Sequence, residues 1–236
     1  MTRTVIANVI AIDGPSGSGK STIARLLAKE LNFLYIDTGS MFRALASYCH
    51  DKKISVENNA EFCGIISNLQ IDYAPNDRQL IVVNDEDYTE KIREHFVSKL
   101  ASEISQIPCV RERLLNLQRS LAEKRTCVME GRDIGSVVFP NAIVKFFVTA
   151  SVEIRAKRRY DQLLSSSDNP NSSEKIELEQ IIADIEKRDK KDQEREIAPL
   201  VQSEGAHFID TSEMSTDEVL ANLKKIVRES FDKSNK

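Results

Sequence analysis

The chain has 236 residues, of which 41% are hydrophobic and 30% are charged. This is the composition of an ordinary globular protein, and the length suits one α/β core with small appended parts rather than two independent domains. The net charge of −4 gives no overall attraction to nucleic acid or anionic membranes, and no segment approaches the roughly 18 consecutive apolar residues of a membrane span. We therefore expect neither nucleic acid nor a membrane among the partners.

The cysteines are scattered along the chain, at Cys49, Cys63, Cys109 and Cys127. They form no C-x-x-C pair, and no histidine lies near them at metal-binding spacing. The pattern predicts reduced thiols in a cytoplasmic protein rather than a disulfide framework.

A phosphate-binding loop follows the first apolar run, residues 5–12, which is predicted to be the first core strand. The loop matches G-x-x-x-x-G-K-[S/T] and, with the residue after it, comprises Gly14, Pro15, Ser16, Gly17, Ser18, Gly19, Lys20, Ser21 and Thr22. Its glycines let successive N–H groups point at phosphate oxygens, and the helix that follows directs its positive end to the same anion. Lys20 is expected to reach the β- and γ-phosphates of a nucleotide, and the Ser21 hydroxyl to ligate Mg²⁺.

Strands and helices alternate along most of the chain. Further strands are predicted at 33–36, 126–129, 143–148 and 207–209. Helices are predicted at about 20–31, 40–51, 57–67, 110–124, 152–164, 174–194 and 216–230. This order predicts a parallel sheet with helices on both faces, and the nearly continuous apolar strands fit burial on both sides.

One segment departs from the alternation. Residues 69–73 and 79–83 have the pattern of strands and flank a polar turn at 74–78. They predict a β-hairpin, extended by a short strand near Tyr88. A hairpin within an α/β pattern indicates an insertion outside the main sheet, at about residues 38–108.

The phosphate loop alone is compatible with GTPases, ATP-driven motors, transporters and small-molecule kinases. The N-K-x-D guanine motif of GTPases is absent. The strand at 126–130 resembles the acidic strand of motors, but it runs directly into Arg132 and Asp133. An arginine at the carboxyl edge of a parallel sheet faces the ligand crevice and can bind an acceptor phosphate through two nitrogens. A structural pairing of Arg132 with Asp133 is the alternative.

Two further groups of arginines are candidates. Arg43 falls one turn into the helix after the second core strand, where it is either a second phosphate clamp or a solvated side chain. Arg188, Asp192 and Arg195 share one face of a predicted helix. With Arg155, Arg158 and Arg159 on the preceding helix, they form either a salt-bridged surface or a lid that closes over phosphates and excludes water. The polar segment 165–173 between these helices is predicted to be mobile.

Four motifs together resemble bacterial-type cytidylate kinase. They are DGPSGSGKST at 13–22, DTGSMFR at 37–43, EGRDIGSVVFP at 130–140 and RDKKDQER at 188–195. The similarity extends from about residue 8 to about residue 228 and includes the hairpin insertion. Phe42 stands where many members have tyrosine, Ser136 where threonine is usual, and Glu130 is a variant of an acidic position. None of these departures removes a group with an assigned chemical role.

The resemblance implies reversible transfer of the ATP γ-phosphoryl group to CMP or dCMP, with Mg²⁺ as cofactor. ATP would be bound by the phosphate loop and Arg158. The residues implied to hold the acceptor are Arg43 and Arg132 at its phosphate, Ser102, Arg111 and Asp133 at the cytosine, Thr38 beside the base, and Arg188 and Asp192 at the ribose and phosphates. Lys20, Arg132, Arg188 and Arg195 would act in catalysis.

We therefore expect a monomeric P-loop kinase with a five-stranded parallel core. The core would comprise about 1–37, 109–150 and 196–236, with a monophosphate-binding insertion at 38–108 and a lid at 151–195. Two alternatives stay open, namely another small-molecule kinase acting on UMP, AMP or shikimate, and a regulator that binds a nucleotide without turning it over.

Overall fold

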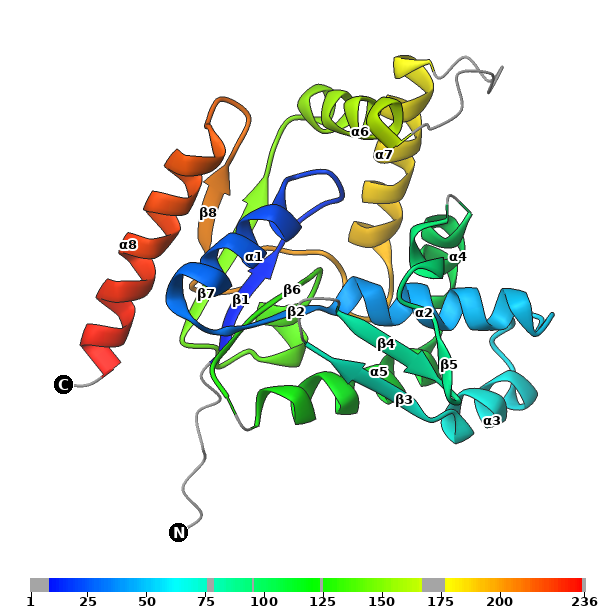
Figure 1. The fold of residues 1–236 in the computed structure, drawn as a ribbon. Coiled ribbons are helices and arrows are strands. Elements are labelled where there is room, and N and C mark those ends of the chain that lie inside the picture. Colours follow the sequence, from blue (N-terminus) through cyan, green and yellow to red (C-terminus); the bar gives the residue numbers. More distant parts are fainter. Residues whose placement is uncertain (1–8, 76–78, 95, 124, 167–176, 235–236) are drawn as a thin grey trace, which may run out of the picture.

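Five parallel strands form the central sheet of the computed structural model, which describes residues 9–75, 79–94, 96–123, 125–166 and 177–234 (Figure 1). In spatial order they are β2 (Leu34–Asp37), β6 (Cys127–Gly131), β1 (Val9–Asp13), β7 (Val144–Thr149) and β8 (His207–Asp210). The predicted parallel sheet is confirmed, and the central strand β1 is buried along its whole length. The part of the predicted first strand before Val9 lies outside the described residues.

Helices cover both faces of this sheet, because alternate strand residues point to opposite sides. On one face, Ile10 and Ile12 pack with α1 (Lys20–Leu31) and α8 (Thr216–Ser234). On the other face, Val9 and Ala11 pack with α2 (Thr38–Asp51) and α5 (Pro108–Ala122). Two more helices, α6 (Val152–Ser166) and α7 (Leu178–Glu194), pack against each other above the carboxyl ends of the strands (Figure 1).

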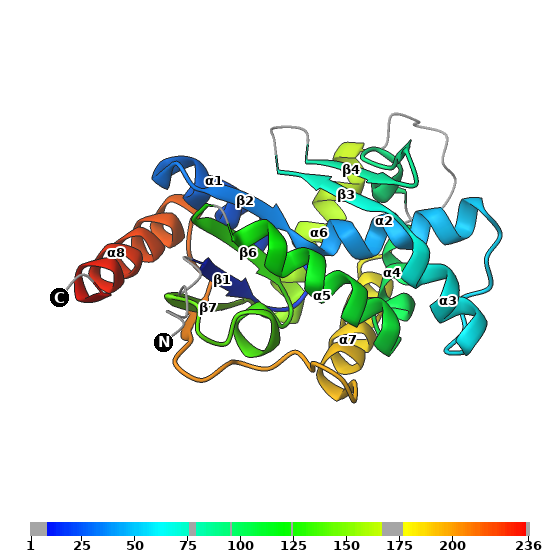
Figure 2. The same ribbon diagram turned by 90° about the horizontal axis from the view of Figure 1, so that it is seen from below.

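The insertion between β2 and β6 lies on the side of the sheet away from α8 (Figure 2). After α2, it contains α3 (Ala60–Asn68), the antiparallel strands β3 (Ile71–Ala74), β4 (Leu80–Val83) and β5 (Glu86–Asp87), a 3-10 turn (Lys91–Arg93) and α4 (Val97–Ile104). The predicted hairpin is confirmed, with its third strand just before Tyr88. The helix α4 was not predicted.

A disulfide joins Cys63 of α3 to Cys109 in the first turn of α5. The prediction of reduced thiols is therefore wrong for this pair, whereas Cys49 and Cys127 are free and buried. The two helices pack closely enough to bring the Cα atoms of Cys63 and Cys109 within 5.8 Å, a separation that a disulfide spans. The two cysteines are 46 positions apart in sequence, and no pattern in the segment between them reveals this proximity.

The described helices include none that combines the length and the apolar character needed to cross a membrane. The segment predicted to be mobile, 165–173, lies outside the described residues from 167 onward.

Candidate active site

Three neighbouring strands deliver polar groups to one edge of the sheet, because parallel strands all end on the same side. β1 ends at Asp13 and leads into the phosphate loop, β2 ends at Asp37 and leads into α2, and β6 ends at Gly131 and leads into Arg132. The predicted site residues that follow these strands therefore lie at the same edge of the sheet.

The phosphate loop curls tightly between β1 and α1. Gly14, Gly17 and Gly19 have φ of 149°, 77° and 86°, values that side chains disfavour. A Cβ on Gly14 would lie 1.9 Å from the Val148 carbonyl oxygen, so a larger residue would displace the loop. Lys20 is the first residue of α1. The loop thus places backbone N–H groups and a helix N-terminus around one point, as phosphate binding requires.

Lys20 is buried within this loop. Its Nζ donates to the Pro15 carbonyl oxygen at 2.7 Å and to Ser18 Oγ at 3.4 Å. Burial, reinforced by the positive charge of Arg132, lowers the pKa of Lys20 to about 7. A phosphate group beside Nζ would reverse this effect by favouring the charged amine.

The residues near Ser21 have the chemistry of a Mg²⁺ site. Ser21 Oγ donates to Glu130 Oε2 at 3.0 Å, and the Tyr35 hydroxyl donates to Glu130 Oε1. Burial and the neighbouring Asp37 raise the pKa of Glu130. Oxygen donors from a hydroxyl and a carboxylate suit Mg²⁺, which keeps several waters and takes its other ligands from phosphates. Among the described residues, no cluster of three His, Cys, Asp or Glu side chains could hold a metal by itself.

The arginines predicted to bind the acceptor phosphate gather beside the loop. Arg43 Nη2 pairs with Asp37 Oδ2 at 2.7 Å, and Arg132 Nε pairs with Asp192 Oδ2 at 3.1 Å. The alternative of an Arg132–Asp133 pair is not what forms. Arg188 has a buried Nε with no hydrogen-bond partner among the described residues. Burial and the charges of Arg132, Arg43 and Arg159 lower the pKa of Arg188 to about 10, despite the opposing effect of Asp192.

A second cluster surrounds Asp133. The Asp133 carboxylate pairs with Arg111 through Oδ2 and lies 3.8 Å from Arg195 Nη2 through Oδ1. Arg111 also donates to the Ser105 carbonyl oxygen and lies over the Phe42 ring, 5.6 Å from its centroid. Ser102 lies on α4, half-buried, and no hydrogen bond from its hydroxyl to Arg111 or Asp133 occurs among the described residues.

A cavity of about 210 Å³ adjoins this cluster. Asp133 and Arg111 form part of its wall, and apolar side chains that include Phe42, Leu115 and Val138 form much of the rest. A planar base with polar edges fits such a lining, because apolar walls contact its faces and a few polar groups fix its orientation.

The other predicted residues have structural partners. Thr38 Oγ1 donates to the Glu130 carbonyl oxygen at 2.7 Å and so joins the ends of β2 and β6. Arg158 donates to the Thr211 hydroxyl and carbonyl oxygens, and a Cβ on Gly19 would lie 3.7 Å from Arg158 Nη1. Arg158 is thus next to the phosphate loop, whereas Arg159 donates to Gln162 and its positive charge lowers the pKa of Arg188.

Asp13 is a site residue that sequence reasoning did not single out. Its two carboxylate oxygens accept from the backbone N–H groups of Ile134 and Gly135, at 2.8 and 2.7 Å. These begin a π-helical turn, Ile134–Val138, directly after Arg132 and Asp133. Burial raises the pKa of Asp13 to about 6. Its position at the end of an apolar strand, beside the loop, was the available signal.

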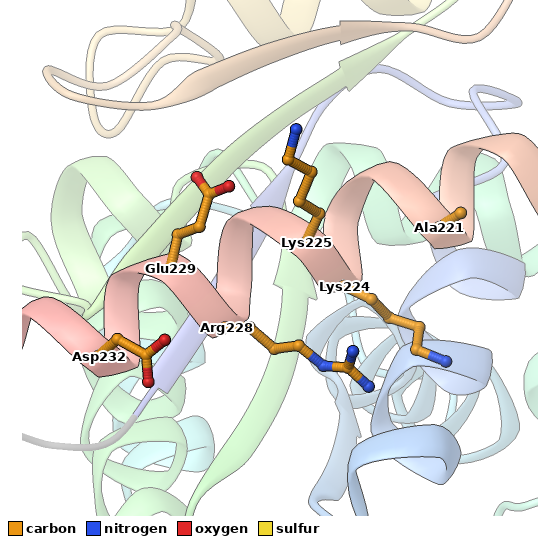
Figure 3. A pocket seen from close by; sticks show the side chains of 6 residues that line it. All are labelled: Ala221, Lys224, Lys225, Arg228, Glu229 and Asp232. Carbon is orange, nitrogen blue, oxygen red and sulfur yellow. The ribbon is translucent and has the colours of Figure 1, made fainter.

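A depression of about 360 Å³ lies elsewhere, along the outer helix α8, and has no such chemistry (Figure 3). All of its lining residues come from α8. Lys224 and Arg228 extend toward α1, where Lys224 pairs with Glu30 (Figure 3). The depression is a solvated helix surface rather than part of the site.

A phosphate loop that faces a cluster of arginines across the carboxyl edge of a parallel sheet defines the class of P-loop phosphotransferases. A family model described as cytidylate kinase matches residues 10–229. The cytidylate kinase of Exiguobacterium sp. is 42% identical over 221 residues, 93% of this chain and 96% of that protein. That of Geobacter sulfurreducens is 43% identical over 222 residues, 94% and 93% of the two chains. The chain therefore belongs to the cytidylate kinase family.

Among solved structures, an uncharacterised protein from Eubacterium ventriosum matches with a TM-score of 0.50. It is 13% identical, and the match covers 93% of this chain and 98% of that one. At this identity the likeness concerns the fold alone.

Proposed function

We propose that the protein transfers the γ-phosphoryl group of ATP reversibly to CMP or dCMP, giving CDP or dCDP and ADP. The observation that carries the proposal is the buried Nε of Arg188, which has no hydrogen-bond partner in the described part of the chain and lies near the charges of Arg43, Arg132 and Arg159. Such repulsion between cations is relieved by a phosphate placed between them. A protein that only senses one nucleotide has no need for a second phosphate site.

The reaction then needs positioning and charge neutralisation rather than a protein base, because the acceptor phosphate is already an anion near pH 7. Lys20 holds the β- and γ-phosphates, Arg132 and Arg43 hold the acceptor phosphate, and Arg188 and Arg195 neutralise charge around the transferred group. Ser21, with Glu130 next to it, would hold Mg²⁺, which would supply positive charge against the negative charge of the phosphates.

Cytosine is selected by hydrogen bonds to Ser102, Arg111 and Asp133. The Asp133 carboxylate accepts from the cytosine amino group, whereas uracil presents a carbonyl oxygen there, which cannot donate to the buried carboxylate and repels it. Arg111 already holds this carboxylate in place. Thr38 lies beside the base, and Asp192 binds the ribose.

The other parts of the chain have the following roles in the proposed reaction. ATP is bound by the loop and Arg158, and α6 and α7, within the lid region 151–195, close over the phosphates. The insertion 38–108 binds the monophosphate, and the core is formed by 1–37, 109–150 and 196–236. We propose that the enzyme is a cytoplasmic monomer.

The test is the release of ADP from Mg·ATP with CMP, dCMP, UMP, AMP or shikimate as acceptor. Fast turnover of CMP and dCMP, with much slower turnover of UMP, is the expected result. Equal rates with CMP and UMP would contradict the role of the Asp133 cluster while leaving a kinase. Binding of ATP without turnover of any acceptor would instead indicate a regulator.

Asp133→Ala tests the cytosine assignment more directly. We expect the KM for CMP to rise by about 100-fold, since a charged hydrogen bond is worth roughly 1.5–3 kcal/mol, while the KM for ATP stays within about threefold. Calorimetric binding of each nucleotide checks this. Equal losses for both nucleotides would mean that Asp133 has a structural role.

A further inference from the structure

Arg155 lies near the start of α6, where its side chain contacts both the phosphate loop and α7. It is 4% exposed, and its guanidinium has three partners from three segments. Nε donates to the Ala150 carbonyl oxygen at 2.9 Å, Nη1 donates to the Ser16 carbonyl oxygen at 3.2 Å, and Nη2 pairs with Asp189 Oδ2 at 2.6 Å. A buried guanidinium with these partners is fixed in one geometry, because its planar fork leaves little freedom.

The phosphate loop rests directly on this side chain. A Cβ on Gly17 would lie 3.1 Å from Arg155 Cβ and 3.2 Å from the Arg155 carbonyl oxygen, so the loop backbone and α6 are in close contact. Ser16, which accepts from Arg155, precedes Gly17 in the same loop. Any shift of the loop when it binds phosphates therefore acts on the Arg155 guanidinium.

The third partner, Asp189, belongs to the helix that carries acceptor-side residues. Arg188 precedes it, and Asp192, which pairs with Arg132, follows one turn later. The other carboxylate oxygen of Asp189, Oδ1, is buried and has no hydrogen-bond partner among the described residues. The pair with Arg155 thus anchors this part of α7, since a buried carboxylate without its cation is costly.

We propose that Arg155 and Asp189 form a positioning bridge that couples the phosphate loop to α7. The bridge fixes the positions of Arg188 and Asp192 relative to a phosphate bound at Lys20. Through it, binding of phosphates to the loop affects these acceptor-side residues of α7. Neither residue touches the reacting atoms. The packing of Ala156 against Ile181 and Ile185 holds the two helices together, and the ion pair fixes their register.

The first test compares Asp189→Asn with the wild type. Asparagine keeps the size and one acceptor but removes the charge. Because small displacements of catalytic groups can lower rates by about 100-fold, we expect kcat with CMP to fall about 10-fold to 100-fold while the KM for ATP changes less than about threefold.

Two control variants accompany Asp189→Asn. Ile181→Val loosens the same helix packing without touching the bridge, and Lys224→Met removes a surface ion pair between α1 and α8. The bridge is refuted if Ile181→Val lowers kcat as much as Asp189→Asn at equal loss of thermal stability, or if Asp189→Asn leaves kcat unchanged.

The second test is a double-mutant cycle with Arg155→Lys, which keeps the charge but cannot reach all three partners. If the residues act as one bridge, the loss of kcat in the double variant is clearly smaller than the product of the single losses. Independent, multiplicative losses would overturn the proposal.

The inference rests on the proposed function, and a measurement without turnover separates the two. Hydrogen exchange of the α7 amides is followed on addition of a non-hydrolysable ATP analogue. We expect slower exchange in the wild type and no change in Asp189→Asn. A wild type that lacks CMP turnover refutes the proposed function, whereas α7 amides that ignore the analogue in the wild type refute the bridge.

Discussion

At the scale of single residues, Lys20 links nucleotide binding to pH. Burial and Arg132 lower its pKa to about 7, so at pH 8 the amine is mostly neutral in the absence of nucleotide. The phosphates of ATP raise this pKa again and favour the ammonium form. Binding of Mg·ATP at pH 8 is therefore expected to take up nearly one proton at Lys20, and the uptake should vanish below about pH 6, where the amine is already charged.

Calorimetry in buffers of different ionisation enthalpy measures this uptake, and Lys20→Met provides the control without a titrating amine. Binding that releases protons at pH 8, or that shows no dependence on the buffer, would contradict the role assigned to Lys20.

The role proposed for Arg188 in the reaction comes with a cost to the stability of the fold. Burial and neighbouring cations lower the pKa of Arg188 to about 10. The charged guanidinium is therefore less stable in the folded protein than in the unfolded chain. We expect Arg188→Met to lower kcat by about 100-fold, yet to leave the free energy of unfolding unchanged or raise it by on the order of 1 kcal/mol. Urea denaturation and steady-state kinetics test this, with exposed Arg228→Met as the control. A large loss of stability in Arg188→Met would show that the arginine holds the fold together.

At the scale of elements, the disulfide between α3 and α5 stabilises the insertion. Closing a loop of 46 residues is worth about 2–4 kcal/mol. We therefore expect a reductant to lower the free energy of unfolding by about that amount, and Cys63→Ser to behave as the reduced wild type.

Burial raises the pKa of Cys49 to about 11 and that of Cys127 to about 12, so these thiols should not react in the native protein.

Thiol counting in denaturant checks the redox state. The oxidised protein should show the two thiols of Cys49 and Cys127, and the two cysteines of the disulfide should add to the count only after reduction. All four thiols without reductant would mean that the bridge does not form in solution.

The elements also show which features the sequence could predict. Strands β1 and β6 could be predicted because both of their faces are buried and their residues are almost all apolar, and the hairpin because a polar turn separates two alternating runs. The helix α4, Val97–Ile104, was missed because it is short and has no side-chain cap. The π-helical turn was missed because its first N–H groups are held by Asp13, 121 residues earlier for Ile134.

The same reasoning applies within the site. Helical spacing predicted that Arg188 and Asp192 share a face, whereas Asp189 lies off that face, and its contact with Arg155 depends on how two helices cross. The proximity of Arg111 to Asp133 came from the family resemblance and not from spacing. Contacts between distant segments are set by packing, which no local pattern records.

At the scale of the whole molecule, the proposed acceptor site of Arg43, Arg132 and Arg188 predicts that the acceptor raises the stability of the folded protein. A ligand present at 100 times its dissociation constant stabilises the folded state by about 2.7 kcal/mol, which for a domain of this size corresponds to a rise in melting temperature of about 5–10 °C. We expect CMP alone to produce this rise, and AMP at the same concentration to produce much less. A shift with ATP but none with CMP would argue against an acceptor site that is assembled before ATP binds.

The pairing of β2 with β6, Leu34 opposite Cys127, has a consequence for how this enzyme could change. The inserted segment leaves the core at the end of β2 and returns through α5, which leads to the start of the neighbouring strand β6. A segment of another length could be exchanged there without breaking a hydrogen bond of the sheet or moving the phosphate loop. Chimaeras that exchange residues 38–108 and keep β2, β6 and the loop would therefore separate the part of acceptor choice that lies in this segment from the part that lies in Arg111, Arg132 and Asp133, which the core retains.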